Sequence, residues 1–85
     1  MKTFKDLDFK LHSNGYFDTQ ARMDFDNEYG VSVINGAGAY CSEGTYEVAI
    51  MYKGALTYST PITDYVIGHQ TPEEVTDIMR QVQEL

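Results

Sequence analysis

Hydrophobic and polar residues alternate along much of the chain, which is the period of a β-strand with one buried face. Near the start, Leu7, Phe9 and Leu11 alternate with charged residues. This alternation predicts a strand over 4–11, with its charged side in water.

Four further segments predict strands, and they group into two hairpins because short turn sequences separate them. The segments are 20–26 with 30–35 and 45–53 with 55–60. Asn27 and Gly30 supply the chemistry of the first turn, and Lys53 with Gly54 makes a tight second turn.

The period changes near the C-terminus, where the sequence predicts an amphipathic helix over 72–84. Thr71 is a typical N-cap, Pro72 suits the first helical position, and Glu74 completes a capping box. One apolar stripe follows at helical spacing, made of Val75, Ile78, Met79, Val82 and Leu85.

These elements predict one α+β domain over 1–85, with a mostly antiparallel four- to five-stranded sheet and the C-terminal helix packed on one face. Pro61 ends the last strand because it has no amide donor. We expect 62–70 to be irregular or one helical turn. Two loops, 12–19 and 35–44, are long enough to carry function.

The chain is strongly acidic: 13 Asp and Glu against 6 Lys and Arg give a net charge of −7. This charge disfavours direct binding to nucleic acids or anionic membranes, and it favours basic protein partners. The lone Cys41 cannot form an intrachain disulfide. Since the sequence shows neither a secretory h-region nor a membrane-spanning apolar stretch, we expect a cytoplasmic protein.

Three glycines, Gly36, Gly38 and Gly44, raise the question of a phosphate-binding loop. Such a loop leads into a helix N-terminus and usually includes a lysine. Here the glycines lead into TYEVAIMY, which predicts a strand, and no lysine lies between positions 11 and 52. We therefore interpret the segment as a hairpin loop that presents Tyr40 to a protein partner.

The sequence offers little for a metal or a catalyst, so we expect no cofactor and no enzyme. The DFDNEYG segment resembles a calcium loop, but Tyr29 stands where glycine is needed and Asn35 where a bidentate glutamate closes the cage. His12, His69 and Cys41 are the only candidates for a nucleophilic pair, and no spacing brings them together.

Carboxylates recur at every second position in two predicted strands, at Asp6, Asp8, Asp24 and Asp26, and Glu28 lies in the adjoining turn. If the strands are neighbours, these side chains form an acidic face. One interpretation is a solvated face that maintains solubility and blunts edge pairing. The other is a surface that imitates nucleic-acid phosphates and occupies a basic channel on another protein.

Seven tyrosines are many for 85 residues, and tyrosine is enriched in protein interfaces. Tyr16 and Tyr40 lie in predicted loops and are the preferred contact residues. Tyr46 and Tyr52 are in phase with apolar strand residues, which places them in the core.

Three segments, YGVSVI at 29–34, YEVAIMYKG at 46–54 and TPITDYVIGHQTPEEVTDIMRQVQ at 60–83, together resemble small acidic proteins of unassigned function encoded by tailed bacteriophages. Proteins of that kind include inhibitors of host defence, anti-CRISPR proteins among them. The resemblance implies an inhibitor that binds a large bacterial host complex without catalysis. It implies no particular site residues, because it covers fold-forming segments.

The leading hypothesis is a phage-encoded inhibitor in the host cytoplasm that binds a nucleic-acid-handling defence complex through the acidic face and adjoining loops. The alternative is a structural or assembly module that forms homodimers or larger assemblies through a strand edge or the apolar helix stripe. A small hydrolytic or metal-dependent enzyme is the weakest hypothesis.

Overall fold

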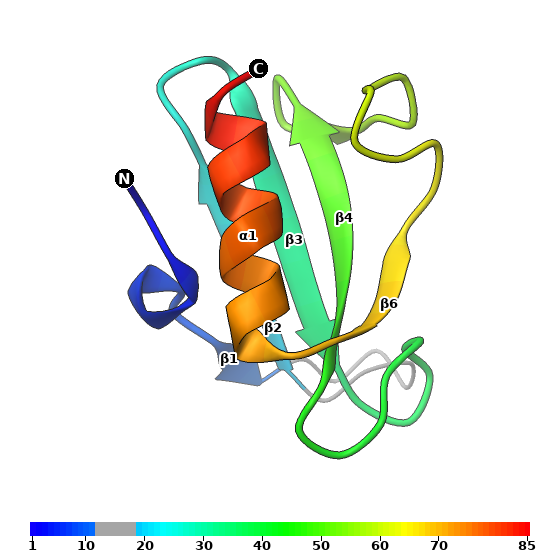
Figure 1. The fold of residues 1–85 in the computed structure, drawn as a ribbon. Helices are drawn as coiled ribbons and strands as arrows, with labels where there is room; N and C mark the ends of the chain where they lie inside the picture. Colours follow the sequence, from blue (N-terminus) through cyan, green and yellow to red (C-terminus); the bar gives the residue numbers. More distant parts are fainter. Residues whose placement is uncertain (12–18) are drawn as a thin grey trace.

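The C-terminal helix packs on one face of a six-stranded antiparallel sheet (Figure 1) in the computed structural model, which describes residues 1–11 and 19–85. The elements are η1 (Phe4–Asp6), β1 (Lys10–Leu11), β2 (Thr19–Asp24), β3 (Tyr29–Asn35), β4 (Tyr46–Tyr52), β5 (Ala55–Leu56), β6 (Ile67–Gln70) and α1 (Pro72–Gln83). The predicted α+β architecture is confirmed.

Strand β4 organises the sheet because it has neighbours along both edges. The first four strands follow the chain order β1-β2-β3-β4. The second edge of β4 is shared: β5 pairs with its C-terminal end, where Met51 lies opposite Leu56, and β6 pairs with its N-terminal end, where Tyr46 lies opposite Gln70. The strand β6 therefore lies on the same side of β4 as the short β5.

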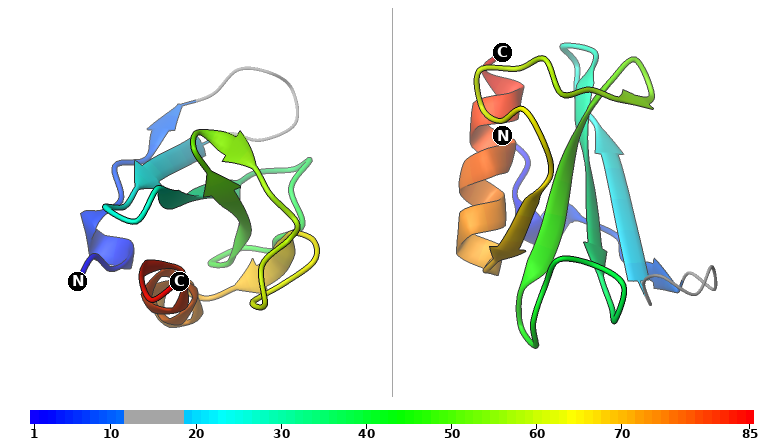
Figure 2. Two further views of the ribbon diagram at one scale, coloured as in Figure 1. Left: turned by 90° about the horizontal axis from the view of Figure 1, so that it is seen from above. Right: turned by 90° about the vertical axis from the view of Figure 1, so that its right-hand side faces the viewer.

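The core lies between α1 and the sheet. The right view of Figure 2 shows the helix lying along one face of the sheet. The helix contributes Val75, Ile78, Met79 and Val82, and the strands contribute Val31, Val33, Val48 and Ile50. Leu85, the last residue of the predicted stripe, lies beyond the helix and remains 38% exposed. The described residues include no helix of the length and apolar character needed to cross a membrane.

Both ends of α1 are fixed by side chains. At the N-terminus the predicted capping box is present: Thr71 Oγ1 accepts from the Glu74 amide at 3.2 Å, and Glu74 Oε1 accepts from the Thr71 amide at 3.0 Å. At the C-terminus Asn27 Nδ2 donates to the Val82 carbonyl at 2.9 Å. The helix is thereby joined to the β2–β3 turn, which supplies Asn27.

The first predicted hairpin is confirmed, but Gly30 has a different role from the one expected. Asn27 does shape the turn, since its Oδ1 accepts from the Tyr29 amide at 3.1 Å. Gly30 instead lies buried inside β3, opposite Asp24. A Cβ at Gly30 would stand 2.5 Å from the Met23 carbonyl oxygen, so glycine permits the close approach of β2 and β3.

The predicted strand over 4–11 is wrong for most of its length. Phe4–Asp6 is a short 3-10 helix, and only Lys10–Leu11 pair with β2. Local hydrogen bonds explain the difference: the Thr3 amide donates to Asp6 Oδ2 at 2.8 Å, and the Phe4 amide donates to Thr76 Oγ1 on α1 at 3.1 Å. The segment is held by the helix rather than by the sheet.

Aromatic packing also favours this turn. Phe4, Phe9 and Tyr46 form a cluster with ring centroids 5.0–5.6 Å apart, packed against the core. The core assignment of Tyr46 is therefore confirmed. That of Tyr52 is wrong, because this residue ends β4 and is 39% exposed.

The second hairpin is present but short. Lys53 and Gly54 form its turn with φ of 50° and 82°, which fits the predicted tight turn. The predicted strand over 55–60 is limited to Ala55–Leu56 and one further hydrogen bond, from the Thr57 amide to the Ile50 carbonyl at 2.9 Å.

The prediction for 62–70 is wrong at its end, where Ile67–Gln70 forms β6. The chain first turns at Thr60, whose Oγ1 donates to the Thr63 carbonyl at 3.3 Å. It then returns beside the free half of the β4 edge. Because β6 is short and His69 has φ of 54°, this strand lacks the long alternation that marks the others.

Candidate functional site

The carboxylates of the predicted acidic face come from two parts of the fold. Asp24, Asp26 and Glu28 lie together at the β2–β3 turn, at the end of the molecule where α1 also ends (Figure 1). We call these three residues the acidic tip. Asp6 and Asp8 lie in the N-terminal segment, and Asp8 lines a shallow hollow with Gln20 and Arg22 of β2.

The acidic tip is exposed and well anchored. Asp24 is the last residue of β2, and the turn after it is closed by a hydrogen bond from the Phe25 amide to the Tyr29 carbonyl at 2.7 Å. Glu28 Oε2 lies 3.9 Å from Lys53 Nζ in an exposed ion pair. Three carboxylates and this one lysine leave the tip with two net negative charges.

The other two predicted carboxylates have local partners. Asp6 accepts from the Thr3 amide, and this hydrogen bond lowers the pKa of the Asp6 carboxyl. Asp8 lies 3.8 Å from Lys10 Nζ. In the sheet, Lys10 lies opposite Gln20 of β2. Gln20 is four residues before Asp24 at the end of β2, so these two residues are about 13 Å apart at about 3.3 Å per residue.

Of the two predicted contact tyrosines, Tyr16 lies outside the described residues and Tyr40 is 58% exposed. The Tyr40 backbone is fixed on both sides: its amide donates to Glu47 Oε1 at 2.8 Å, and its carbonyl accepts from the His69 amide at 2.8 Å. The glycine loop is therefore attached to β4 and β6. It lies at the end of the molecule opposite the acidic tip (Figure 1).

The candidates for nucleophilic chemistry are not arranged as a pair. Cys41 Sγ lies 3.5 Å from both the amide and the carbonyl of Gly36, in the glycine loop. His69 is exposed on β6, and His12 is outside the described residues. Among residues 1–11 and 19–85, no group of three or more His, Cys, Asp or Glu side chains is placed to hold a metal ion.

A groove that the sequence analysis missed lies between α1 and the segment that ends in β6. Its apolar lining consists of Ile62, Ile67 and Ile78, and its acidic rim consists of Glu73, Glu74 and Asp77. The volume is about 480 Å³. We call it the isoleucine groove.

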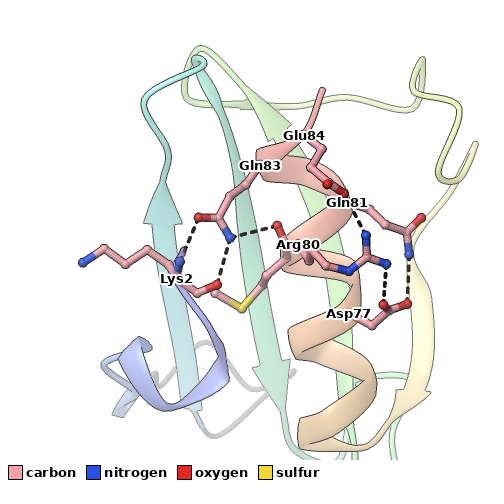
Figure 3. A network of polar contacts seen from close by, with 7 residues as sticks. Lys2, Asp77, Arg80, Gln81, Gln83 and Glu84 are labelled. Atoms are coloured by element: carbon pink, nitrogen blue, oxygen red, sulfur yellow. Dashed lines mark hydrogen bonds and ion pairs between the residues drawn. The ribbon is translucent and has the colours of Figure 1, made fainter.

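A polar network on α1 fixes the charge at one side of this groove (Figure 3). Arg80 donates to Asp77 Oδ1 at 2.6 Å and to Glu84 Oε1 at 2.8 Å, and Gln81 Nε2 donates to Asp77 Oδ2 at 3.1 Å. The hydrogen bond from Arg80 lowers the pKa of the Asp77 carboxyl. Because one guanidinium serves two carboxylates, the rim stays negative.

Two signals in the sequence point to this region. Between Arg22 and Arg80 the chain has nine acidic residues and one basic residue, Lys53. In addition, Ile62 and Ile67 fall in a segment for which the sequence predicts neither a strand nor a long helix. The predicted fold therefore contains no surface against which these two apolar side chains would pack. The first signal gives the charge of the groove and the second gives its apolar lining.

No protein-family model, curated protein sequence or solved structure matches this chain. The class of protein is therefore defined by its architecture, an α+β fold in which one C-terminal helix covers an antiparallel sheet. Within this class the chain is distinguished by the acidic tip and the isoleucine groove.

Proposed function

We propose that this chain is a non-catalytic binding protein that blocks a larger partner with a basic surface. The kind of partner that fits best is a bacterial nucleic-acid-handling complex, such as a CRISPR–Cas defence system, and the protein would then be a phage-encoded inhibitor acting in the host cytoplasm. The supporting observation is the distribution of charge, nine acidic residues against one lysine between Arg22 and Arg80.

The described ion pairs strengthen this asymmetry because they occupy three of the six basic side chains. Lys10 pairs with Asp8, Lys53 with Glu28, and Arg80 with Asp77 and Glu84. Arg22 donates to the Gly54 carbonyl at 3.3 Å. The remaining carboxylates therefore dominate the field around the protein, which accelerates encounter with a basic partner.

The acidic tip suits an inhibitory role because it is held in place before binding. Hydrogen bonds within the turn and from Asn27 to α1 hold its backbone. A preorganised surface loses little conformational entropy on binding. Carboxylates on such a turn can thus replace nucleic-acid phosphates in a basic channel.

The test is capture of partners from bacterial lysate on the tagged protein, with identification by mass spectrometry and washes of rising salt. We expect one nucleic-acid-handling complex that salt releases. The variant Asp24→Lys/Asp26→Lys should bind it at least about tenfold more weakly. The control Asp8→Lys/Glu43→Lys has the same net charge but leaves the tip intact, and equal losses in both variants would contradict a role for the tip.

Self-association is the second candidate function, and one observation favours it. β1 lies at the end of the strand order, and its Leu11 is 89% exposed. An exposed strand edge can pair with another copy. A strand edge supports this function better than the apolar helix stripe, because Val75, Ile78, Met79 and Val82 are buried in the core. Light scattering over a concentration series, with Leu11→Lys as the comparison, separates this function from inhibition.

A further inference from the structure

We propose that the isoleucine groove is a docking site for a short segment of the partner protein that presents an aliphatic side chain flanked by lysine or arginine. This inference rests on the proposed binding function and names the surface and the partner chemistry. The groove differs from the acidic tip in combining an apolar lining with negative charge.

The lining is built from three parts of the chain. Ile62 precedes β6, Ile67 begins β6, and Ile78 lies on α1. Ile62 and Ile67 pack against the core yet remain partly exposed, whereas Ile78 is 5% exposed. The groove has a volume of about 480 Å³, which is ample for an aliphatic side chain.

The rim determines the charge of the occupant. Glu73 and Glu74 lie in the first turn of α1, and Asp77 lies one turn further along the same side. Glu74 also accepts from the Thr71 amide, which fixes its carboxylate over the helix start. Three carboxylates along the α1 side of an apolar lining complement a segment in which cationic residues flank an aliphatic one.

The occupant binds through side chains rather than as an added strand, because the backbone of β6 is already engaged. The His69 amide donates to the Tyr40 carbonyl at 2.8 Å, and the Gly68 carbonyl accepts from Gln70 Nε2 at 3.0 Å. A register shift between Tyr46 and Val48 also interrupts the pairing of β6 with β4. Such features blunt a sheet edge.

A second copy of this chain is a poor occupant. Each copy has a net charge of −7, so two copies repel each other. Acidic residues outnumber basic ones by 13 to 6 on the other copy, and Lys10, Lys53 and Arg80 are paired with acidic residues of their own chain. The charge of the rim therefore favours a different, basic protein.

The first test is an NMR titration of the isotopically labelled protein with a short synthetic peptide of alternating lysine and leucine. We expect shifts of the Ile67, Gln70, Ile78 and Gln81 amides. A lysine–serine peptide removes the aliphatic group, and a glutamate–leucine peptide reverses the charge, so both should bind at least about tenfold more weakly. Shifts confined to the acidic tip, or equal binding of the lysine–serine peptide, would overturn the docking site.

Variants then separate the groove from the tip. Glu73→Lys changes an exposed rim residue and should weaken the lysine–leucine peptide by about tenfold. Asp26→Lys makes the same charge change at the tip and should weaken it by less than about threefold. Equal effects of the two variants would overturn the docking site. If the two variants had equal effects but the partner were still captured from lysate, the proposed function would stand without the docking site. Failure to capture any partner from lysate would count against the proposed function.

Discussion

The acidic tip and the isoleucine groove each present three carboxylates, but they are built differently. The tip is a turn whose charged side chains project into water beside Lys53. The groove places Glu73, Glu74 and Asp77 of α1 beside buried and partly buried isoleucines. One region offers charge alone, and the other offers charge together with apolar surface.

The difference separates two contributions to binding. Exposed charges act at a distance and chiefly raise the rate of encounter, whereas apolar contacts act after contact and chiefly slow dissociation. We therefore expect the tip to control association and the groove to control residence time. The four predictions that follow test this division, beginning with the largest effect.

Gly68→Ala should abolish the groove while leaving the tip intact. A Cβ at Gly68 would stand 2.7 Å from the Tyr40 carbonyl oxygen and 2.8 Å from Tyr40 Cβ, so β6 or the glycine loop must move. We expect the free energy of unfolding to fall by about 2–3 kcal/mol. Chemical denaturation measures this loss, and NMR spectra show which amides shift.

Gly54→Ala is the matched control for that variant. A Cβ at Gly54 meets no atom within 4 Å, but its φ of 82° is unfavourable for alanine. The expected loss is about 1 kcal/mol, from backbone conformation alone. A loss at Gly54 as large as that at Gly68 would show that the contact with Tyr40 does not determine the position of β6.

Binding kinetics should divide between the two regions. Against the captured partner, Asp24→Lys/Asp26→Lys should lower the association rate constant by about tenfold, with a smaller change in dissociation. Ile67→Ser should raise the dissociation rate constant by about tenfold and leave association nearly unchanged. Surface plasmon resonance at two salt concentrations measures both constants, and a slower association of the Ile67 variant would contradict the division.

Thr71→Ala should destabilise the first turn of α1, which forms one end of the groove. The variant removes the N-cap acceptor for the Glu74 amide, and we expect a loss of about 1 kcal/mol in unfolding free energy. Thr71→Ser retains the hydroxyl and should restore most of the loss. Chemical denaturation of the unchanged protein and the two variants measures the free energy of unfolding of each. Equal stability of the alanine and serine variants would contradict the role of the cap.

The smallest expected effect is a dependence of stability on pH through Asp77. Arg80 lowers the pKa of this carboxyl in the folded protein. Its contribution is therefore present above the unfolded pKa of about 3.9 and is lost as pH falls through the lower folded value. Asp77→Asn and Arg80→Met should both flatten the fall in unfolding free energy below about pH 4, and an unchanged slope in both would contradict the pairing.

Sequence patterns predicted the elements in which buried side chains recur over several helical turns or over several residue pairs of a hairpin. The helix was predicted to within one residue because Thr71, Pro72 and Glu74 mark its start and four buried side chains repeat at helical spacing. The segment over 4–11 was misinterpreted because Phe4 and Leu7 suit a short turn as well as a strand. The Thr3 and Asp6 pair was the available signal for that turn.

The groove could not be predicted in the same way because its lining comes from parts of the chain that meet only in the folded protein. Ile62 and Ile67 line the groove together with Ile78 because β6 returns beside β4. That return depends on a short strand with an interrupted register. The alternation of residues within one segment does not show which other segment will pack against it. The surplus of acidic residues, in contrast, is visible directly in the sequence.

The hydrogen bonds between Lys2 and Gln83 have a consequence for engineering. The Lys2 amide donates to Gln83 Oε1 at 2.9 Å, and Gln83 Nε2 donates to the Lys2 carbonyl at 2.8 Å (Figure 3). The two ends of the described chain are thus adjacent, so a short linker can join Leu85 to Met1. A circular permutant opened between Lys53 and Gly54 would keep the groove on a continuous stretch of chain and would cut the molecule beside the tip.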